Sequence, residues 1–250
     1  MKRFEGIHRR VRFSGPVTFF PSHQITGPLK RTLQAAAIIL LLGTGCQQKQ
    51  QKDVADFGQR MLNYFTGSTP INAAKKMEDQ YFPDERREGI AKLSDESAGR
   101  GPIYTKRYEQ IAQFDSDWLV RATAIRALNR SRDTAATPIF IRALSDDNDI
   151  VRVEAAKALA NNPDPNATSV LVRIVSNANE NKDVRIWSAD ALKHYKSLEV
   201  ARTLTNQLGG REFGVSWQSR KSLIILTGRD LGYDESAWLE YLTGPDRPFS

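Results

Sequence analysis

An eight-residue pattern that begins with arginine and ends with leucine is the feature that most constrains the fold of this chain. Four copies occur without gaps: RREGIAKL (86–93), RATAIRAL (121–128), RVEAAKAL (152–159) and RIWSADAL (185–192). Their arginines are 35, 31 and 33 residues apart. A fifth copy, SWQSRKSL (216–223), keeps the leucine but has serine at the first place. Similarity within a chain at such a period indicates a repeat protein.

These repeat octets have the pattern of a helix with one buried face. Counted from the arginine, apolar or small residues recur at positions −1, +3, +4 and +7, which lie on one side of an α-helix. Position +3 is small in all five copies, as Gly89, Ala124, Ala155, Ser188 and Ser219. Small side chains let a neighbouring helix approach closely, so we expect tight helix packing there.

A second amphipathic stretch precedes each octet. The five stretches are 71–81, 104–114, 137–144, 169–175 and 200–208. The repeating unit is therefore a helical hairpin, and a single hairpin cannot bury both of its apolar faces. Neighbouring hairpins must stack. The sequence predicts an all-α solenoid of about five hairpins over residues 71–225.

The two ends of the repeat region have the pattern of caps. Residues 53–70 carry an apolar stripe that predicts an N-terminal capping helix followed by a loop. Residues 226–250 predict a C-terminal cap. Gly228 can end the fifth repeat helix, and Asp234 or Ser236 can begin a last one. That last helix would place Trp238 and Leu242, four residues apart, over the exposed end of the stack.

The repeats resemble the HEAT and HEAT-like (phycobilisome-lyase-type) families. The motifs that carry the resemblance run from Asp117 to Leu128, from Asp149 to Leu159 and from Asp183 to Leu192. The resemblance implies that the octet helices line the concave side. It also implies that aspartates and arginines of successive repeats form a buried ladder, with Arg86, Arg121, Arg152 and Arg185 as its arginines. The C-terminal segment resembles that of HEAT-repeat proteins of bacterial cell envelopes.

Residues 1–45 read as a leader for export. The apolar run 33–42 follows Lys30 and Arg31 and is too short to span a bilayer, which takes ~20 residues. Small residues then precede Cys46, the only cysteine of the chain. This arrangement resembles the lipobox of bacterial lipoproteins, although Gly43 stands where that motif usually has leucine. We therefore expect a lipid on Cys46, a polar tether over 46–52 and attachment to the periplasmic side of the cell envelope. Ordinary leader cleavage, an uncleaved anchor and an incidental cysteine stay open.

Charge is unevenly distributed along the chain. Residues 1–45 hold seven of the 36 basic residues and one of the 29 acidic ones. Residues 46–250 therefore carry a net charge of only +1. Nucleic-acid binding through the phosphate backbone requires clustered lysine and arginine, so we expect no nucleic-acid partner.

Trp187 is the candidate contact residue for a protein partner. It occupies octet position +2, off the apolar stripe, where a bulky aromatic can anchor an interface. Arg126, Lys157 and Asp190 share position +5 and should flank it. The alternative is that Trp187 folds back over the neighbouring repeat.

Other motifs favour structural roles. The acidic run 145–149 lacks the spacing of a calcium loop and precedes a repeat helix, where acids cap free N–H groups. His194 has no histidine partner in the body of the chain, so we expect no metal site. No catalytic residue, cofactor or metal is expected. The sequence predicts a protein-binding scaffold. An enzyme or a chaperone resembling chromophore lyases is the alternative.

Overall fold

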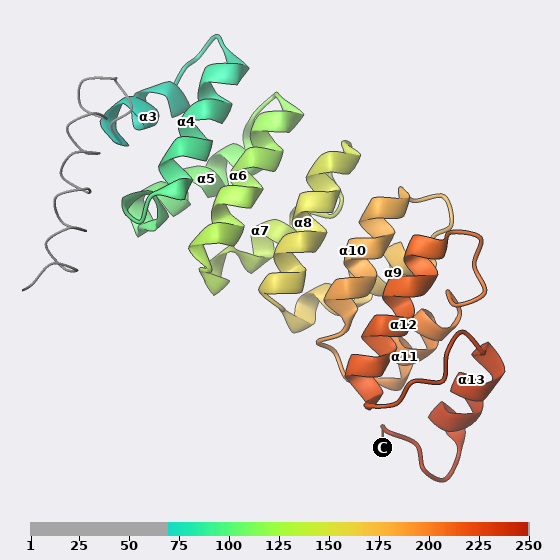
Figure 1. Cartoon of the computed structure of the whole chain (residues 1–250). Helices are drawn as coiled ribbons and strands as arrows, with labels where there is room; N and C mark the ends of the chain where they lie inside the picture. Colours follow the sequence, from blue (N-terminus) through green and yellow to red (C-terminus); the bar gives the residue numbers. More distant parts are fainter. Residues whose placement is uncertain (1–69, 250) are drawn as a thin grey trace, which may run out of the picture. The chain divides into compact units, whose positions relative to one another are not determined.

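The structure of the protein is a computed structural model that describes residues 70–249. Within these residues the chain forms eleven α-helices, three short 3-10 helices and no strand. Figure 1 shows the helices following one another as stacked hairpins. The all-α solenoid predicted from the repeat octets is therefore confirmed.

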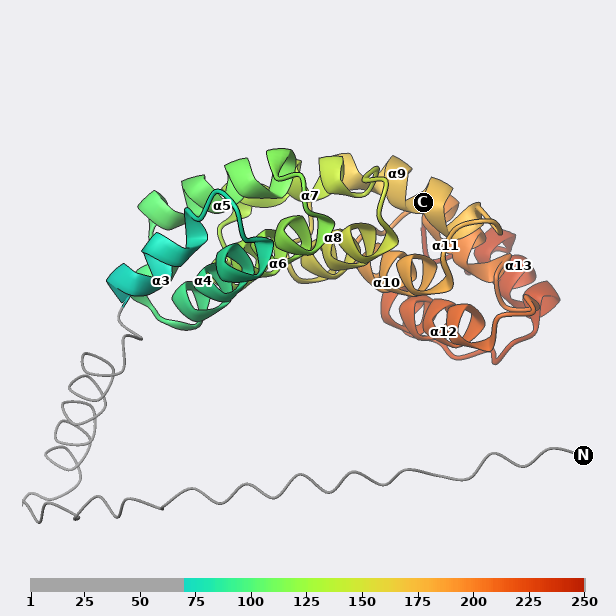
Figure 2. The ribbon, with the colours of Figure 1, turned by 90° about the horizontal axis from the view of Figure 1, so that it is seen from above.

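The helices of these residues lie in two layers. One layer holds α3 (Pro70–Met77), α5 (Pro102–Phe114), α7 (Thr137–Ala143), α9 (Thr168–Ser176) and α11 (Leu198–Thr205). The other holds the octet helices α4 (Pro83–Asp95), α6 (Trp118–Ser131), α8 (Asp149–Asn161), α10 (Lys182–Leu192) and α12 (Phe213–Thr227). Figure 2 shows that the hairpins curve and that the octet helices lie along the inner side of the curve. We call this side the inner face.

Most helix boundaries lie within two residues of those expected from the amphipathic stretches. The largest differences are the ends of α3 and α11, which come four and three residues earlier than expected. After α3 the carboxylate of Asp79 accepts hydrogen bonds from the N–H groups of Tyr81 and Phe82, at 2.8 and 2.7 Å. These bonds offer the backbone an alternative to the helix. Pro83 then requires an extended residue before it, and Phe82 is extended.

Short 3-10 helices connect some of the hairpins. They are η1 (Ala98–Arg100), η2 (Thr134–Ala136) and η3 (Pro165–Ala167). Asp133 begins η2 by accepting the N–H of Ala135 at 2.9 Å, and Asp164 begins η3 in the same way through Asn166. Aspartate suits this place because its side chain satisfies a backbone N–H that has no helical partner.

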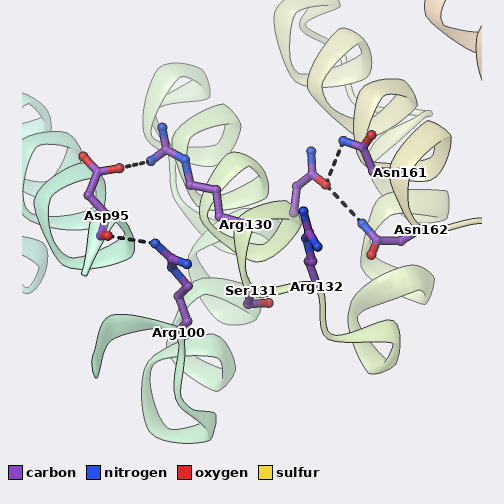
Figure 3. A pocket seen from close by; sticks show the side chains of 8 residues that line it. Asp95, Arg100, Arg130, Ser131, Arg132, Asn161 and Asn162 are labelled. Carbon is purple, nitrogen blue, oxygen red and sulfur yellow. Dashed lines mark hydrogen bonds and ion pairs between the residues drawn. The ribbon is translucent and has the colours of Figure 1, made fainter. Parts of the chain in front are cut away.

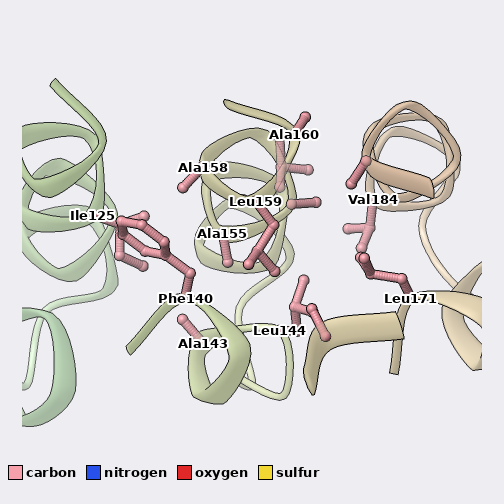
Figure 4. Packing of buried hydrophobic residues seen from close by; sticks show 14 of the residues in the cluster. Ile125, Phe140, Ala143, Leu144, Ala155, Ala158, Leu159, Ala160, Leu171 and Val184 are labelled. Atoms are coloured by element: carbon pink, nitrogen blue, oxygen red, sulfur yellow. The ribbon is translucent and has the colours of Figure 1, made fainter. Parts of the chain in front are cut away.

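The core runs between the two layers as one continuous cluster. Figure 4 shows Phe140 of α7 against Ile125 of α6, and Leu171 of α9 beside Val184 of α10. Phe140, Ile125 and Leu171 are fully buried. Each outer helix thus places its large side chains between two inner helices, so a hairpin buries its apolar surface only by stacking on its neighbours.

The small residues at octet position +3 allow the close approach that the sequence predicts. All five are buried. Gly89 is the extreme case, because a Cβ atom there would lie 2.4 Å from the backbone N of Met77 and 2.5 Å from the carbonyl O of Ala73. Neither contact can be relieved by rotating a side chain, so α3 and α4 can pack at this distance only with glycine at position 89.

The C-terminal cap covers mainly the outer layer. Gly228, with a φ of 76°, ends α12. Asp234 rather than Ser236 then caps the final helix α13 (Glu235–Thr243), because its carboxylate accepts the N–H of Ala237. α13 packs against α11 and buries Trp238 completely. The final helix thus lies against the outer layer, whereas Trp217 on α12 of the inner layer stays 45% exposed.

Several expectations lie outside the described residues. These are the leader over 1–45, Cys46, the tether over 46–52 and the capping helix with its loop over 53–69. None of the helices between residues 70 and 249 combines the length and the apolar character that a transmembrane helix requires.

Candidate functional site

The arginines at the first octet position are held by acidic residues of the following hairpin. Arg86 binds Asp115 with two hydrogen bonds of 2.8 Å, and Arg121 binds Asp146 at 2.7 and 2.9 Å. Arg152 binds Glu180 at 2.8 Å. The fourth arginine, Arg185, binds Glu212 at 2.5 Å and the side-chain oxygen of Gln207 at 2.7 Å. The side chains of the four arginines are only 8–18% exposed.

Backbone carbonyls extend these pairs into a ladder. The carboxylate of Asp115 receives Arg86, while its carbonyl oxygen accepts from Arg121 at 3.0 Å. Asp146 is used in the same way, since its carbonyl accepts from Arg152 at 2.8 Å. Each guanidinium thus ties its own hairpin to the next one. These bonds join the repeats, so we do not assign the four arginines to ligand binding. The buried Nε of Arg152 has no hydrogen-bond partner among residues 70–249.

The aspartates of the motifs that resemble HEAT repeats are not the partners of these arginines. Asp117 caps α6 by accepting the N–H groups of Leu119 and Val120, both at 2.9 Å. Asp149 accepts the side-chain N–H of Asn181 at 2.7 Å. The third motif aspartate, Asp183, lies in the first turn of α10. The partners come earlier, in the turn between the two helices of a hairpin, where a carboxylate can reach the preceding arginine.

In the acidic run 145–149, too, the residue that binds an arginine differs from the residue that caps the helix. Asn148, not an aspartate, caps α8 by accepting the N–H of Ile150 at 2.9 Å. Burial acts to raise the pKa of Asp146, but hydrogen bonds from Arg121 and from the N–H of Asn148 outweigh it and hold that pKa below its usual value. In turn, the hydrogen bond to Asp146 raises the pKa of Arg121. Among residues 70–249 no group of three or more His, Cys, Asp or Glu side chains is arranged to hold a metal ion.

A second row of contacts crosses the inner face between octet positions +5 and +2. Position +5 of one inner helix meets position +2 of the next. Arg126 of α6 pairs with Glu154 of α8 at 3.1 Å. Lys157 of α8 lies over the ring of Trp187 of α10, 5.3 Å from its centroid. Asp190 of α10 accepts the side-chain N–H of Gln218 of α12 at 2.8 Å. We call Arg126, Glu154, Lys157 and Trp187 the inner row.

Glu154 is the residue of the inner row that sequence analysis did not single out. It is buried, and besides Arg126 it binds Lys157 at 2.9 Å. It therefore joins two of the predicted site residues. The signal for it was its octet position, +2, which it shares with Trp187 and Gln218.

The four predicted contact residues are only partly brought together. Lys157 lies directly against Trp187, as expected for a flanking residue, and Arg126 is linked to it through Glu154. Asp190 instead binds Gln218 on α12. It also binds Lys193, directly after α10, at 2.9 Å. Trp187 remains 37% exposed, so it does not fold away completely over its neighbour. A cation over an aromatic ring is attracted by the ring quadrupole, which holds both side chains at the surface.

His194 lies away from this row, at the end of α10. Its Nε2 atom is 2.8 Å from the carbonyl oxygen of Ala160 on α8. The contact joins the C-terminal ends of two inner helices, where a side-chain donor satisfies a free carbonyl.

Comparison with known proteins supports the repeat assignment. The family model of HEAT repeats matches residues 106–193 and 137–223. A search of curated proteins finds no match.

Two solved structures are similar to the chain. One is the crystal structure of an engineered protein, with 19% identity and a TM-score of 0.48 over 70% of this chain and 89% of that one. The other is human deoxyhypusine hydroxylase in complex with glycerol, with 15% identity and a TM-score of 0.37 over 64% of this chain and 74% of that one. The family match agrees with the stacked hairpins and their octets, and residues 106–223 of this chain form HEAT repeats.

Proposed function

We propose that the protein is a non-catalytic scaffold whose inner face binds a protein partner. The observation that carries the proposal is Trp187, a partly exposed tryptophan held under Lys157 on the inner face. Stacked helical repeats present long curved surfaces that suit protein binding. The inner row adds to such a surface the residue types that dominate interface energetics, tryptophan and arginine.

The geometry of the inner row supports a preformed contact site. Glu154 is buried and fixes both Arg126 and Lys157, while Lys157 fixes the ring of Trp187. Side chains that are already ordered lose less conformational entropy when a partner binds. Opposite charges alternate along the row, a pattern that contributes to the choice of partner and its register.

Replacing Trp187 with alanine should weaken partner binding by about tenfold or more, because a central tryptophan typically contributes 2 kcal/mol or more at an interface. The matched control is Trp217→Ala. Trp217 is also partly exposed and also carries a lysine over its ring, with Nζ of Lys221 at 4.4 Å, but it lies outside the inner row. The measurement is affinity capture from solubilised membranes followed by a titration of the purified partner.

The proposal requires a protein that is captured by the wild type and by Trp217→Ala but lost with Trp187→Ala. A capture that is the same for all three proteins would contradict the assignment of the inner row. If the wild type retains no protein at all, the scaffold function itself fails.

We further propose that the scaffold is a lipoprotein of the bacterial cell envelope, attached through Cys46. The support is in the sequence alone: a basic flank, a short apolar run, small residues and then the single cysteine. Two acyl chains on one residue give the two anchoring chains that stable attachment requires. The polar residues 47–52 would separate the lipid from the repeats.

The intact mass of the protein extracted from membranes tests this anchor. We expect a chain that begins at Cys46 and carries the added mass of a lipid, and we expect Cys46→Ser to abolish that added mass. An unmodified chain that begins elsewhere would show ordinary cleavage. An unmodified full-length chain would show an uncleaved leader. Either result would overturn the lipid anchor while leaving the inner row to its own test.

A further inference from the structure

A basic pocket lies at the C-terminal ends of α4, α6 and α8, away from the inner row. It has a volume of about 770 Å³. Figure 3 shows its lining side chains, which come from three successive hairpins. They are Asp95, Arg100, Asn129, Arg130, Ser131, Arg132, Asn161 and Asn162. Three arginines and one aspartate give this lining a net charge of +2.

Two of the three arginines are held in place by the ends of the repeat helices. Arg100 donates to the carbonyl oxygens of Ser94 and Asp95, at 3.1 and 2.8 Å. Arg130 binds the carboxylate of Asp95 at 2.8 Å and the hydroxyl of Ser94 at 3.0 Å. Both side chains are therefore ordered beside the pocket before any ligand arrives, and each guanidinium has further donors left over.

Arg132 is different, because its guanidinium has no hydrogen-bond or ion-pair partner among residues 70–249. It also ends α6 in the left-handed conformation, with φ 55° and ψ 26°. No other non-glycine residue in the described part of the chain has a positive φ. Helices that end in this way usually carry glycine or asparagine at this place. A strained arginine with a free head group beside a pocket is an observation that points to function.

The amide of Asn129 supplies a further donor. Its side-chain oxygen accepts from the side-chain nitrogens of Asn161 at 3.2 Å and Asn162 at 3.1 Å. These two bonds fix the orientation of the amide, and its NH₂ group has no acceptor among residues 70–249. Asp133 follows Arg132 in the chain, but its carboxylate is directed to the N–H of Ala135.

We propose that this pocket binds the dianion of a phosphate monoester. Arginine donors match phosphate oxygens in geometry and in charge, and a dianion balances the net charge of the lining. Arg132 would bind the phosphate directly, together with Arg130 and the amide of Asn129. Asp95 competes with the ligand for Arg130 and so limits the affinity. This site is independent of the inner row and of any partner bound there.

The test compares the full chain with three variants. Arg132→Gly should raise the Tm by about 2–4 °C, because glycine relieves the left-handed conformation. The same variant should weaken phosphate binding about tenfold or more, as expected for the loss of a charge-assisted contact. Asp95→Asn should instead strengthen binding several-fold by freeing Arg130. The control, Arg173→Ala, removes the same charge from an exposed arginine on α9 and should leave binding unchanged.

Two arms distinguish the sources of the phosphate. One titrates glycerol 3-phosphate by calorimetry at constant ionic strength. The other measures binding to vesicles of phosphatidylcholine with and without phosphatidic acid, whose head group is a phosphate monoester. Binding in either arm that is lost in Arg132→Gly and kept in Arg173→Ala supports the site and names its source. Equal binding by these two variants, or saturable binding in neither arm, would overturn the proposal. The raised Tm expected of Arg132→Gly excludes misfolding as the cause of a loss of binding in that variant.

Discussion

Replacing Arg121 with methionine is expected to lower the free energy of unfolding by about 3–5 kcal/mol, the range for removing one partner of a buried ion pair. The side chains of Arg121 and Asp146 are 12% and 13% exposed, and two hydrogen bonds join them. Without the guanidinium, Asp146 stays buried with an uncompensated charge. The carbonyl of Asp115, in the same hairpin as Arg121, also loses its donor. Chemical denaturation of the two proteins measures the difference.

Arg107→Met is the matched control for this prediction. Arg107 binds Glu78 through two hydrogen bonds of 2.6 and 2.7 Å, so the geometry resembles that of the ladder pair. Both side chains are far more exposed, at 41% and 50%. Exposed ion pairs contribute about 0–1 kcal/mol, so this variant should lose little stability. Similar losses in the two variants would contradict the view that the ladder pairs contribute more to stability because they are buried.

The pH dependence of the loss provides a second check. The pKa of Asp146 is lowered in the folded chain. Its contribution is therefore complete above the ordinary value of 3.8 and disappears as the pH falls through the lowered folded pKa. The difference in stability between wild type and Arg121→Met should shrink as the pH falls below about 4. In Arg121→Met, the further change Asp146→Asn should recover part of the loss at neutral pH, since it removes the unpaired charge.

The ladder also explains which parts of the fold the sequence predicts well. The octets repeat because each inner helix makes the same contacts. Its arginine binds an acidic residue in the turn of the next hairpin, its small residue packs against the paired helix, and its leucine lies in the core. Contacts that recur in every hairpin produce a residue pattern that recurs in the sequence, so the hairpins and most of their boundaries can be predicted from it. The identity of the acidic partners does not follow from the repeat period. These partners lie in the turns between the two helices of a hairpin, and the turns differ in length from one hairpin to the next.

The inner row also contains residues that the repeat period predicts and one that it does not. Trp187 and Lys157 were predictable because both occupy octet positions on the inner side of their helices. Glu154 was missed because a buried glutamate resembles any other residue of an amphipathic helix until its two cationic partners are placed around it. Position +2 is buried at Thr123, Glu154 and Gln218, half-buried at Glu88 and exposed at Trp187. Local packing, not the period, decides that difference.

The basic pocket has no counterpart in the sequence analysis. Arg100 belongs to a 3-10 helix, Arg130 and Arg132 to the end of α6, and Asn161 to the end of α8. These residues come from three hairpins and lie outside the octets, where no periodic signal exists. Only the stacking of the hairpins brings them to one place. The left-handed conformation of Arg132 was equally hidden, because arginine is not a residue that marks a helix end of this kind.

Trp238→Ala is expected to destabilise the C-terminal end of the repeats by about 3–5 kcal/mol, the range for truncating a fully buried tryptophan. Trp238 has no exposed surface, and its indole N–H donates to the carbonyl of Gly232 at 3.0 Å. The variant leaves a cavity between α13 and α11 and an unsatisfied carbonyl in the loop before α13. Leu239→Ala is the control, since Leu239 is the next residue of the same helix and is 38% exposed.

The way in which Trp238→Ala loses stability is more informative than the amount. In a repeat protein each hairpin is stabilised mainly by its immediate neighbours, so removing the cap should release the last hairpin first. Amide hydrogen exchange should rise in α11 and α13, while α6 and α8 keep their protection because their own neighbours are intact. Uniform loss of protection along the repeats would show instead that the hairpins unfold as one cooperative unit. The inner row would then depend on the cap as well, because Trp187 lies on α10, the inner helix next to the last hairpin.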